Sequence, residues 1–173
     1  MKILLIGGSK SGKSRLAQEL VRSFGRPMVY WAAMEPADEE DRRRIEKHLR
    51  DRDGWGFQTL ECGRALEAAF PLLPQNAAVL FDSITALLAN EMFGAAAEEN
   101  AGERAARELL ALAGHAEHLV CVCDDLWREE DAYGRLTRQF QRELARICRG
   151  LAAQFDTVCE VTAGIPHLWK GRF

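Results

Sequence analysis

Short apolar runs alternate with amphipathic segments along most of the chain. Apolar runs of about four to eight residues are typical of buried strands, and apolar positions three and four residues apart are typical of helices. The pattern predicts buried strands at residues 3–6, 27–33, 77–81, 118–123 and 157–162. It predicts helices at 15–24, at the start of 36–53, briefly within 62–73, at 83–93, at 99–113 and after residue 134. In the last helix, one apolar face carries Leu136, Phe140, Leu144, Ile147 and Leu151, and residues 164–173 are predicted to form a short tail.

Strands that are separated by helices pair in parallel through right-handed crossovers. The chain therefore predicts an α/β fold in which a mainly parallel sheet is covered on both faces. Ligands of such sheets bind beyond the carboxyl ends of the strands. Those ends are followed here by the loop after Ile6, by residues 32–35, and by Asp82, Asp124 and Asp125. No linker or repeat divides residues 1–173, so a single domain is expected.

Composition narrows the classes of partner. The 173 residues carry a formal net charge of −3 with a pI of about 5.9, which argues against a nucleic-acid or anionic-membrane partner because both need clustered positive charge. No apolar run approaches the roughly 18 residues of a membrane span. The five cysteines include no C-x-x-C pair, so reduced, core-filling thiols are expected. These features predict a cytoplasmic protein that acts on small molecules.

Residues 7–14 match the pattern G-x-x-x-x-G-K-[ST] between a predicted strand and a predicted helix. Glycines let backbone N–H groups turn inward, the helix offers its positive end, and the lysine reaches the β- and γ-phosphates of a nucleotide. The serine would bind Mg²⁺. The alternative is an ordinary Gly/Ser turn. The flanking elements favour a phosphate loop made of Gly7, Gly8, Ser9, Lys10, Ser11, Gly12, Lys13 and Ser14.

Asp82 closes the apolar strand at 77–81. Phosphate-loop enzymes use a carboxylate in such a place to hold Mg²⁺. The alternative is that Asp82 caps the helix that follows. Beside a phosphate loop, the metal role is the favoured interpretation.

His48 lies in the densely charged segment 36–53. If that segment is helical, Arg44, His48 and Arg52 share one face at i, i+4 and i+8. Two guanidinium groups would disfavour the protonated imidazole and leave a neutral nucleophile. The alternative is a solvated charged helix in which His48 has no chemical role.

Several motifs in a fixed order then point to a known family. They are the phosphate loop, Arg44-Ile-x-x-His48, Thr59-x-Glu61, Val79-Leu-Phe-Asp82-Ser-Ile-Thr85 and Leu136-x-Arg-x-Phe140. Together they resemble the adenosylcobinamide kinase/adenosylcobinamide-phosphate guanylyltransferase family over nearly the whole chain. The resemblance implies a RecA-like phosphate-loop fold and a homotrimer. It also implies two reactions, phosphorylation of adenosylcobinamide by GTP or ATP and transfer of GMP from GTP to the new phosphate.

The resemblance also assigns residues by position. It implies that His48 accepts GMP, while the motifs themselves give Lys13 as the second catalytic residue and Ser14 and Asp82 as the ligands of Mg²⁺. Further GTP contacts are implied at Ala32, Ala33, Met34, Leu49, Arg50, Asp51, Arg52, Glu61 and Asp82.

The chain departs from the family at several places, including one extra residue before Glu61 and Arg149 in place of an asparagine. Leu49 and Asp53 stand where the family has a basic residue and a proline, and Asp124-Asp-Leu-Trp stands where it has Asn-Glu-Val-Gly. Three hypotheses follow: a cobinamide enzyme with one or both activities, a phosphate-loop kinase with another hydroxyl acceptor, and a nucleotide-binding regulatory protein without turnover.

Overall fold

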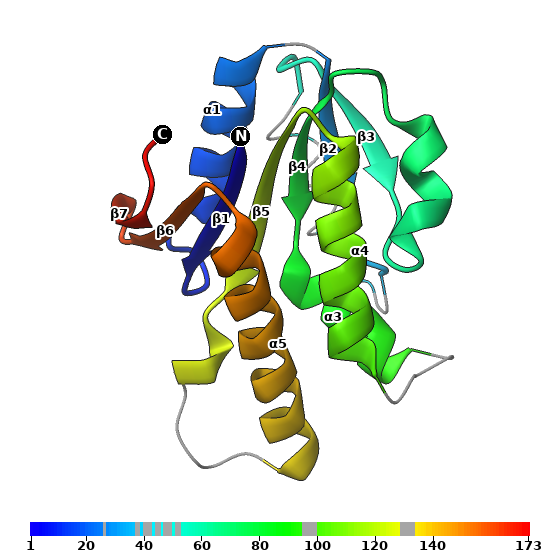
Figure 1. Ribbon diagram of the computed structural model, residues 1–173, viewed down its shortest axis with the longest axis vertical. Helices are drawn as coiled ribbons and strands as arrows, with labels where there is room; N and C mark the ends of the chain where they lie inside the picture. The colour runs from blue at the N-terminus through cyan, green and yellow to red at the C-terminus, as the bar shows by residue number, and fades with distance from the viewer. Residues whose placement is uncertain are drawn as a thin grey trace.

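The computed structural model describes residues 1–25, 27–36, 39, 43, 46, 50, 53–94, 100–128 and 134–173. Within these ranges, seven strands form one sheet in the order β3-β2-β4-β5-β1-β6-β7 (Figure 1). They are β1 (Lys2–Gly7), β2 (Met28–Ala32), β3 (Phe57–Glu61), β4 (Ala78–Asp82), β5 (His118–Asp124), β6 (Thr157–Thr162) and β7 (Ile165–Lys170). Every neighbouring pair is parallel except β6 with β7. The predicted, mainly parallel sheet is confirmed.

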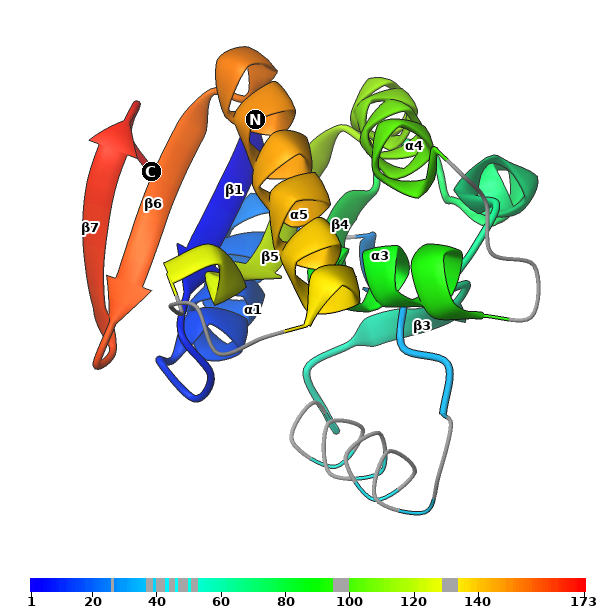
Figure 2. The ribbon, with the colours of Figure 1, turned by 90° about the horizontal axis from the view of Figure 1, so that it is seen from below.

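Helices cover both faces of the sheet and make a three-layer structure. They are α1 (Lys13–Phe24), α3 (Ile84–Phe93), α4 (Ala101–His115) and α5 (Arg135–Gln154), with 3₁₀ turns η1 (Leu66–Leu72) and η2 (Leu126–Arg128). Helix α1 packs on one face, while α3, α4, α5 and η1 pack on the other (Figure 2). In the part of the chain that is described, no helix is both long and apolar enough to cross a membrane.

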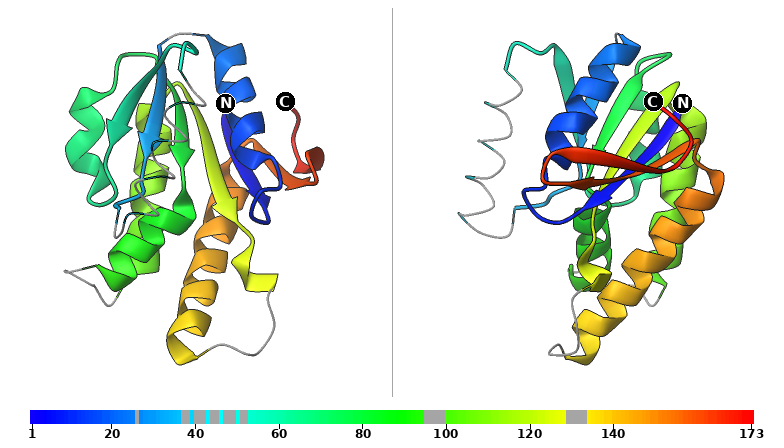
Figure 3. Two further views of the ribbon diagram at one scale, coloured as in Figure 1. Left: turned by 180° about the vertical axis from the view of Figure 1, so that it is seen from behind. Right: turned by 90° about the vertical axis from the view of Figure 1, so that its left-hand side faces the viewer.

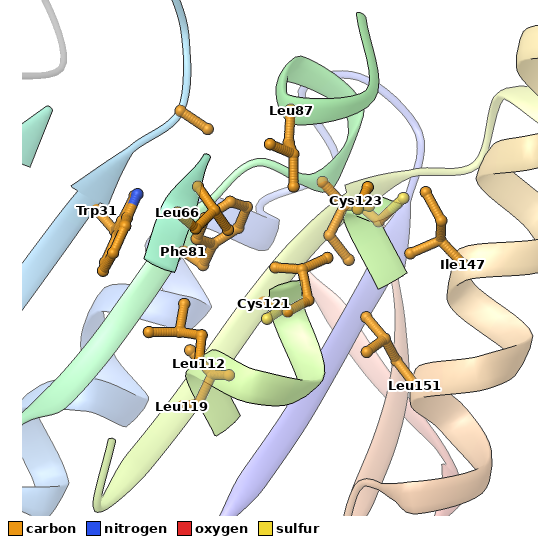
Figure 4. Close-up of a cluster of buried hydrophobic side chains, with 14 of the residues drawn as sticks. Trp31, Leu66, Phe81, Leu87, Leu112, Leu119, Cys121, Cys123, Ile147 and Leu151 are labelled. Atoms are coloured by element: carbon orange, nitrogen blue, oxygen red, sulfur yellow. The ribbon is translucent and has the colours of Figure 1, made fainter. Parts of the chain in front are cut away.

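The central strands are buried on both faces, because each strand sends alternate side chains into two separate cores. On β2, for example, Trp31 points into the core under α3, α4 and α5, and Tyr30 points into the core under α1. Figure 4 shows the larger core, where Trp31, Phe81 and Cys121 meet side chains from the covering helices. This two-sided burial explains why the sequence shows continuous apolar runs at these strands.

The cysteines are free thiols, as expected. Burial raises the pKa of the Cys121 and Cys123 thiols well above the ordinary range. Cys148 on α5 packs against Cys123, with 3.4 Å between the two sulfur atoms. The Cys121 and Cys123 thiols therefore stay protonated and act as small apolar side chains of the core.

Three sequence predictions need correction. Residues 164–173 were expected as a tail but contain β7, and a further strand, β3, was not predicted at all. Both are edge strands with mostly exposed side chains, so neither carries the apolar pattern of a buried strand. Leu136 was placed on the buried face of the last helix, yet it is 61% exposed, whereas Phe140, Leu144, Ile147 and Leu151 are buried.

Helix α5 offers a direct test of this packing. Leu144→Ala should lower the free energy of unfolding by about 2–5 kcal/mol, because it opens a cavity in the core. Leu136→Ala, the same change on an exposed position of the same helix, should shift it by no more than about 0.5 kcal/mol. Denaturant unfolding followed by circular dichroism measures both. Equal, small losses in the two variants would contradict the described packing of α5.

Candidate active site

The segment between β1 and α1 folds into a tight loop that begins after Gly7 and ends at Gly12. The amide of Ser11 donates to the carbonyl oxygen of Gly8 at 3.2 Å. Gly12 has a φ of +98°, which glycine adopts at little cost. Helix α1 starts at the next residue, and the first N–H groups and the dipole of a helix favour a negative charge there. Loop and helix together form the kind of cradle that binds phosphate.

The side chain of Lys13 turns back into this loop. Its Nζ donates to the carbonyl oxygen of Gly8 at 2.7 Å and to Oδ1 of Asp124 at 3.0 Å. The Lys13 side chain is only 6% exposed and that of Asp124 is 33% exposed. A buried ammonium group is costly unless it is paired, and these two acceptors pair it. The positive charge therefore lies within the cradle, beside the point where a phosphate would bind.

The side chain of Ser11 also indicates that the loop can bind an anion with hydrogen-bond acceptors. Its Oγ is buried and has no hydrogen-bond partner among the described residues. Buried hydroxyl groups are nearly always hydrogen-bonded in native proteins. A phosphate oxygen in the loop would provide the missing acceptor.

The loop is also held from the far side by the hairpin of β6 and β7 (Figure 3, right). The amide of Gly164, in the turn of that hairpin, donates to the carbonyl oxygen of Ser11 at 2.8 Å. A Cβ on Gly7 would lie 2.3 Å from the carbonyl oxygen of Val161 on β6. Only glycine fits at position 7, so the first glycine of the motif is required by packing against β6 as well as by the turn.

The contact between Asp124 and Lys13 was not predicted from the sequence. The sequence placed Asp124 and Asp125 on the correct rim, but it gave no sign that Asp124 pairs with Lys13. Asp124 ends β5 and lies level with Gly7 of β1. Its backbone amide donates to Oγ1 of Thr85 on α3 at 3.0 Å. Thr85 was likewise missed, because a threonine in the first turn of a helix carries no chemical signal.

Asp82 lies on the same rim, but not next to the phosphate loop. Strand β5 separates its strand, β4, from β1. The hydroxyl of Tyr30 donates to Oδ2 of Asp82 at 2.7 Å. The alternative role as a helix cap is wrong, because Ser83 caps α3 by accepting from the amide of Ala86 at 3.2 Å. Its carboxylate at the end of β4 is a reasonable ligand for Mg²⁺, which prefers oxygen.

The structure describes some of the other predicted nucleotide contacts but not all of them. Ala32 lies level with Glu61 on one side and with Asp82 on the other, so these three residues share the rim. Ala33 continues β2 by donating to the carbonyl oxygen of Asp82 at 3.0 Å, and Met34 lines a pocket beside α3. Arg50 is helical and exposed. His48, Leu49, Asp51 and Arg52 lie outside the described residues.

A metal ion at this rim would depend on few protein ligands. Within the described ranges, no three His, Cys, Asp or Glu side chains gather closely enough to hold a metal. Mg²⁺ is usually bound through one or two protein oxygens together with substrate phosphates and water. Ser14, in the first turn of α1, and Asp82 provide such oxygens.

Comparison with known proteins finds relatives that match nearly the whole chain. The chain is 31% identical to the bifunctional adenosylcobalamin biosynthesis protein CobP of Pseudomonas aeruginosa over 99% of its length and 98% of that protein. It is 30% identical to the bifunctional adenosylcobalamin biosynthesis protein CobU of Salmonella typhimurium over 95% of its length and 97% of that protein. These are relatives of nearly the same length.

The fold is similar to that of the RadB recombinase. The two structures have a TM-score of 0.52 at 17% identity, over 99% of this chain and 81% of that chain. At this identity the likeness concerns the fold alone, and it confirms the predicted RecA-like phosphate-loop type. The model of one family matches residues 3–168. With the relatives above, this match shows that the chain belongs to the cobinamide kinase / cobinamide phosphate guanyltransferase family.

Proposed function

We propose that the protein binds a nucleoside triphosphate with Mg²⁺ at residues 7–14 and uses it in two steps of cobalamin biosynthesis. The first is phosphorylation of the hydroxyl group of adenosylcobinamide by GTP or ATP. The second is transfer of GMP from GTP to the new phosphate. The observation that carries the proposal is the buried Lys13 in the phosphate loop of a chain that belongs to this family. A cytoplasmic location, one domain and a homotrimer remain predictions.

In the kinase step, the acceptor hydroxyl oxygen attacks the γ-phosphorus. The bond from that phosphorus to its bridging oxygen breaks, the nucleoside diphosphate leaves, and the hydroxyl proton passes to solvent. Lys13 and the N-terminus of α1 stabilise negative charge on the phosphate oxygens. Mg²⁺ would be held by Ser14 and Asp82 and would neutralise part of the phosphate charge.

In the guanylyl step, we assign the nucleophile to His48 from the family resemblance. A neutral ring nitrogen attacks the α-phosphorus of GTP, a P–N bond forms, and pyrophosphate leaves as the α,β P–O bond breaks. An oxygen of the phosphorylated acceptor then attacks the same phosphorus and releases the imidazole. Imidazole suits both steps because it is a nucleophile when neutral and a good leaving group when protonated.

Lys13→Ala should abolish turnover and weaken binding of Mg²⁺-GTP by about 10- to 100-fold, because charge-assisted hydrogen bonds to the phosphates are lost. Isothermal titration calorimetry measures the affinity. Arg15→Ala removes an exposed positive charge two residues along the same helix and should leave both properties nearly unchanged. Unaltered affinity and activity in Lys13→Ala would rule out the phosphate-loop interpretation.

Asp124→Asn should tighten binding of Mg²⁺-free GTP by about 5- to 30-fold. The amide can still accept a hydrogen bond from Lys13, but a negative charge beside the phosphates has gone, which at partly exposed positions is worth on the order of 1–2 kcal/mol. Glu19→Gln, which removes a half-exposed carboxylate from α1, is the matched control. Weaker binding in Asp124→Asn would show that this carboxylate supports the nucleotide rather than competing with it for Lys13.

Labelled GTP tests the two reactions separately. Label in the γ-phosphate should pass to adenosylcobinamide, and label in the α-phosphate should pass first to the protein and then to the phosphorylated corrinoid. Mass spectrometry at mildly alkaline pH should show a GMP adduct that His48→Asn lacks and that His115→Asn, a change on α4, retains. The adduct should be labile in acid and stable in base. An unmodified wild-type protein that still binds GTP would show that the guanylyl step is wrongly assigned.

A further inference from the structure

A pocket lies between α3 and the segment that follows β2, on the same rim as the phosphate loop. Its volume is about 390 Å³. The apolar part of its lining comes from Met34, Pro36, Ala86, Ala89 and Phe93. We refer to it as the α3 pocket.

Helix α3 is apolar on more sides than the core requires. Ile84, Leu87 and Leu88 are fully buried, and they account for the packing of the helix on the sheet. Ala86 and Ala89 pack against the edge of this core and also line the pocket. Phe93 lines the pocket too; it is 54% exposed and stacks on Phe140 of α5, with ring centroids 5.7 Å apart. A large exposed ring beside two small residues leaves an apolar wall with space in front of it, which is a usual feature of a small-molecule site.

The walls of the α3 pocket are fixed in place. The side-chain amide of Asn90 donates to the carbonyl oxygens of Ala33 and Gly63, at 2.7 and 3.0 Å. A Cβ on Gly63 would lie 2.5 Å from Nδ2 of Asn90. A Cβ on Gly94 would likewise collide with the guanidinium of Arg64. Glycine at both positions leaves room for the side chains of Asn90 and Arg64 in these places.

The polar groups of the pocket offer both donors and acceptors. Arg64 pairs with Glu35, with Nη2 and Oε2 3.1 Å apart, and the two side chains are 28% and 47% exposed. An arginine has five N–H donors and a carboxylate accepts several hydrogen bonds, so the pair keeps capacity for a ligand. The paired carboxylate makes the site unsuitable for a phosphate. It suits a neutral group that both donates and accepts, such as a primary amide.

Helix α3 connects the α3 pocket to the phosphate loop. Thr85 accepts from the backbone amide of Asp124, and Asp124 pairs with Lys13. The next residue, Ala86, lines the pocket. The first turn of α3 therefore connects a ligand in the pocket to Lys13, the lysine that would hold the γ-phosphate.

We propose that the α3 pocket receives an amide-bearing edge of the corrinoid acceptor, an inference that rests on the proposed function. A corrin ring carries methyl groups and primary amide side chains around its rim. The methyl groups fit the apolar wall, an amide N–H fits Glu35, and an amide oxygen fits Arg64. At about 390 Å³ the pocket takes one edge of the macrocycle, and the arm that carries the hydroxyl group extends past α3 toward the phosphate loop.

Two variants test the proposal. Ala89→Leu fills the pocket, and Glu35→Gln removes its negative charge without changing its shape. Titration of adenosylcobinamide by visible absorbance, with a non-hydrolysable GTP analogue and Mg²⁺ present, should show affinity lowered about tenfold or more by Ala89→Leu and about threefold by Glu35→Gln. Calorimetry should show binding of the analogue changed less than about twofold. Ala111→Leu makes the matched change in a different pocket, lined by Glu67, Phe70, Pro71 and His115, and should alter neither affinity.

Unchanged corrinoid affinity in both α3-pocket variants would overturn the proposal while leaving the proposed function intact. Weaker binding of the GTP analogue in these variants, with corrinoid affinity unchanged, would overturn it in favour of a site for the nucleotide base. A wild-type protein that binds the analogue but no adenosylcobinamide would overturn the proposed function and this inference together. Circular dichroism of Ala89→Leu distinguishes a filled pocket from a misfolded helix, and Glu35→Gln, at a half-exposed position, gives an independent result.

Discussion

The ammonium group of Lys13 is the charge around which the rim of the sheet is arranged. It is nearly buried, so it requires fixed acceptors, and it finds them on two different elements, at Gly8 in the loop and at Asp124 at the end of β5. Thr85 fixes the backbone of Asp124 in turn. One buried charge thereby links the loop after β1, the end of β5 and the start of α3.

The edge hairpin takes part in the same constraint. Strand β6 passes so close to Gly7 that no side chain fits there, and the hairpin turn at Gly164 supports the carbonyl oxygen of Ser11. The turn has positive φ at both Ala163 and Gly164, of 51° and 79°, as expected for a two-residue hairpin. Strand β7 is mostly exposed, but the hairpin to which it belongs determines the shape of the phosphate loop.

The parts of the fold that could be predicted are those in which burial on two faces leaves a continuous apolar run. The five central strands were predicted for that reason, whereas α1, α3, α4 and α5 were predicted from apolar positions three and four residues apart. The phosphate loop was predicted because phosphate binding requires glycines and a lysine at this spacing. Edge strands β3 and β7 are specified by pairing with a neighbour rather than by their own composition. The contact of Lys13 with Asp124 joins residues 111 positions apart, and only the order of the strands brings them together. Asp82 could be predicted at the rim because a carboxylate at the end of a strand can hold Mg²⁺. Its hydrogen bond with Tyr30 could not be predicted, because Tyr30 lies in an apolar run that gave no sign of a polar role.

The start of α3 shows how one short segment can serve chemistry and recognition together. Asp82 ends β4 at the rim, Ser83 caps the helix, Thr85 holds the strand that carries Asp124, and Ala86 forms the pocket wall. Successive helical residues point about 100° apart, so neighbours in sequence face different sites. The helix needs a firm cap because a shift of its first turn would move both the backbone support of Asp124 and the wall of the α3 pocket. In the proposed complex, the turn between β4 and α3 would set the position of the corrinoid edge relative to the γ-phosphate.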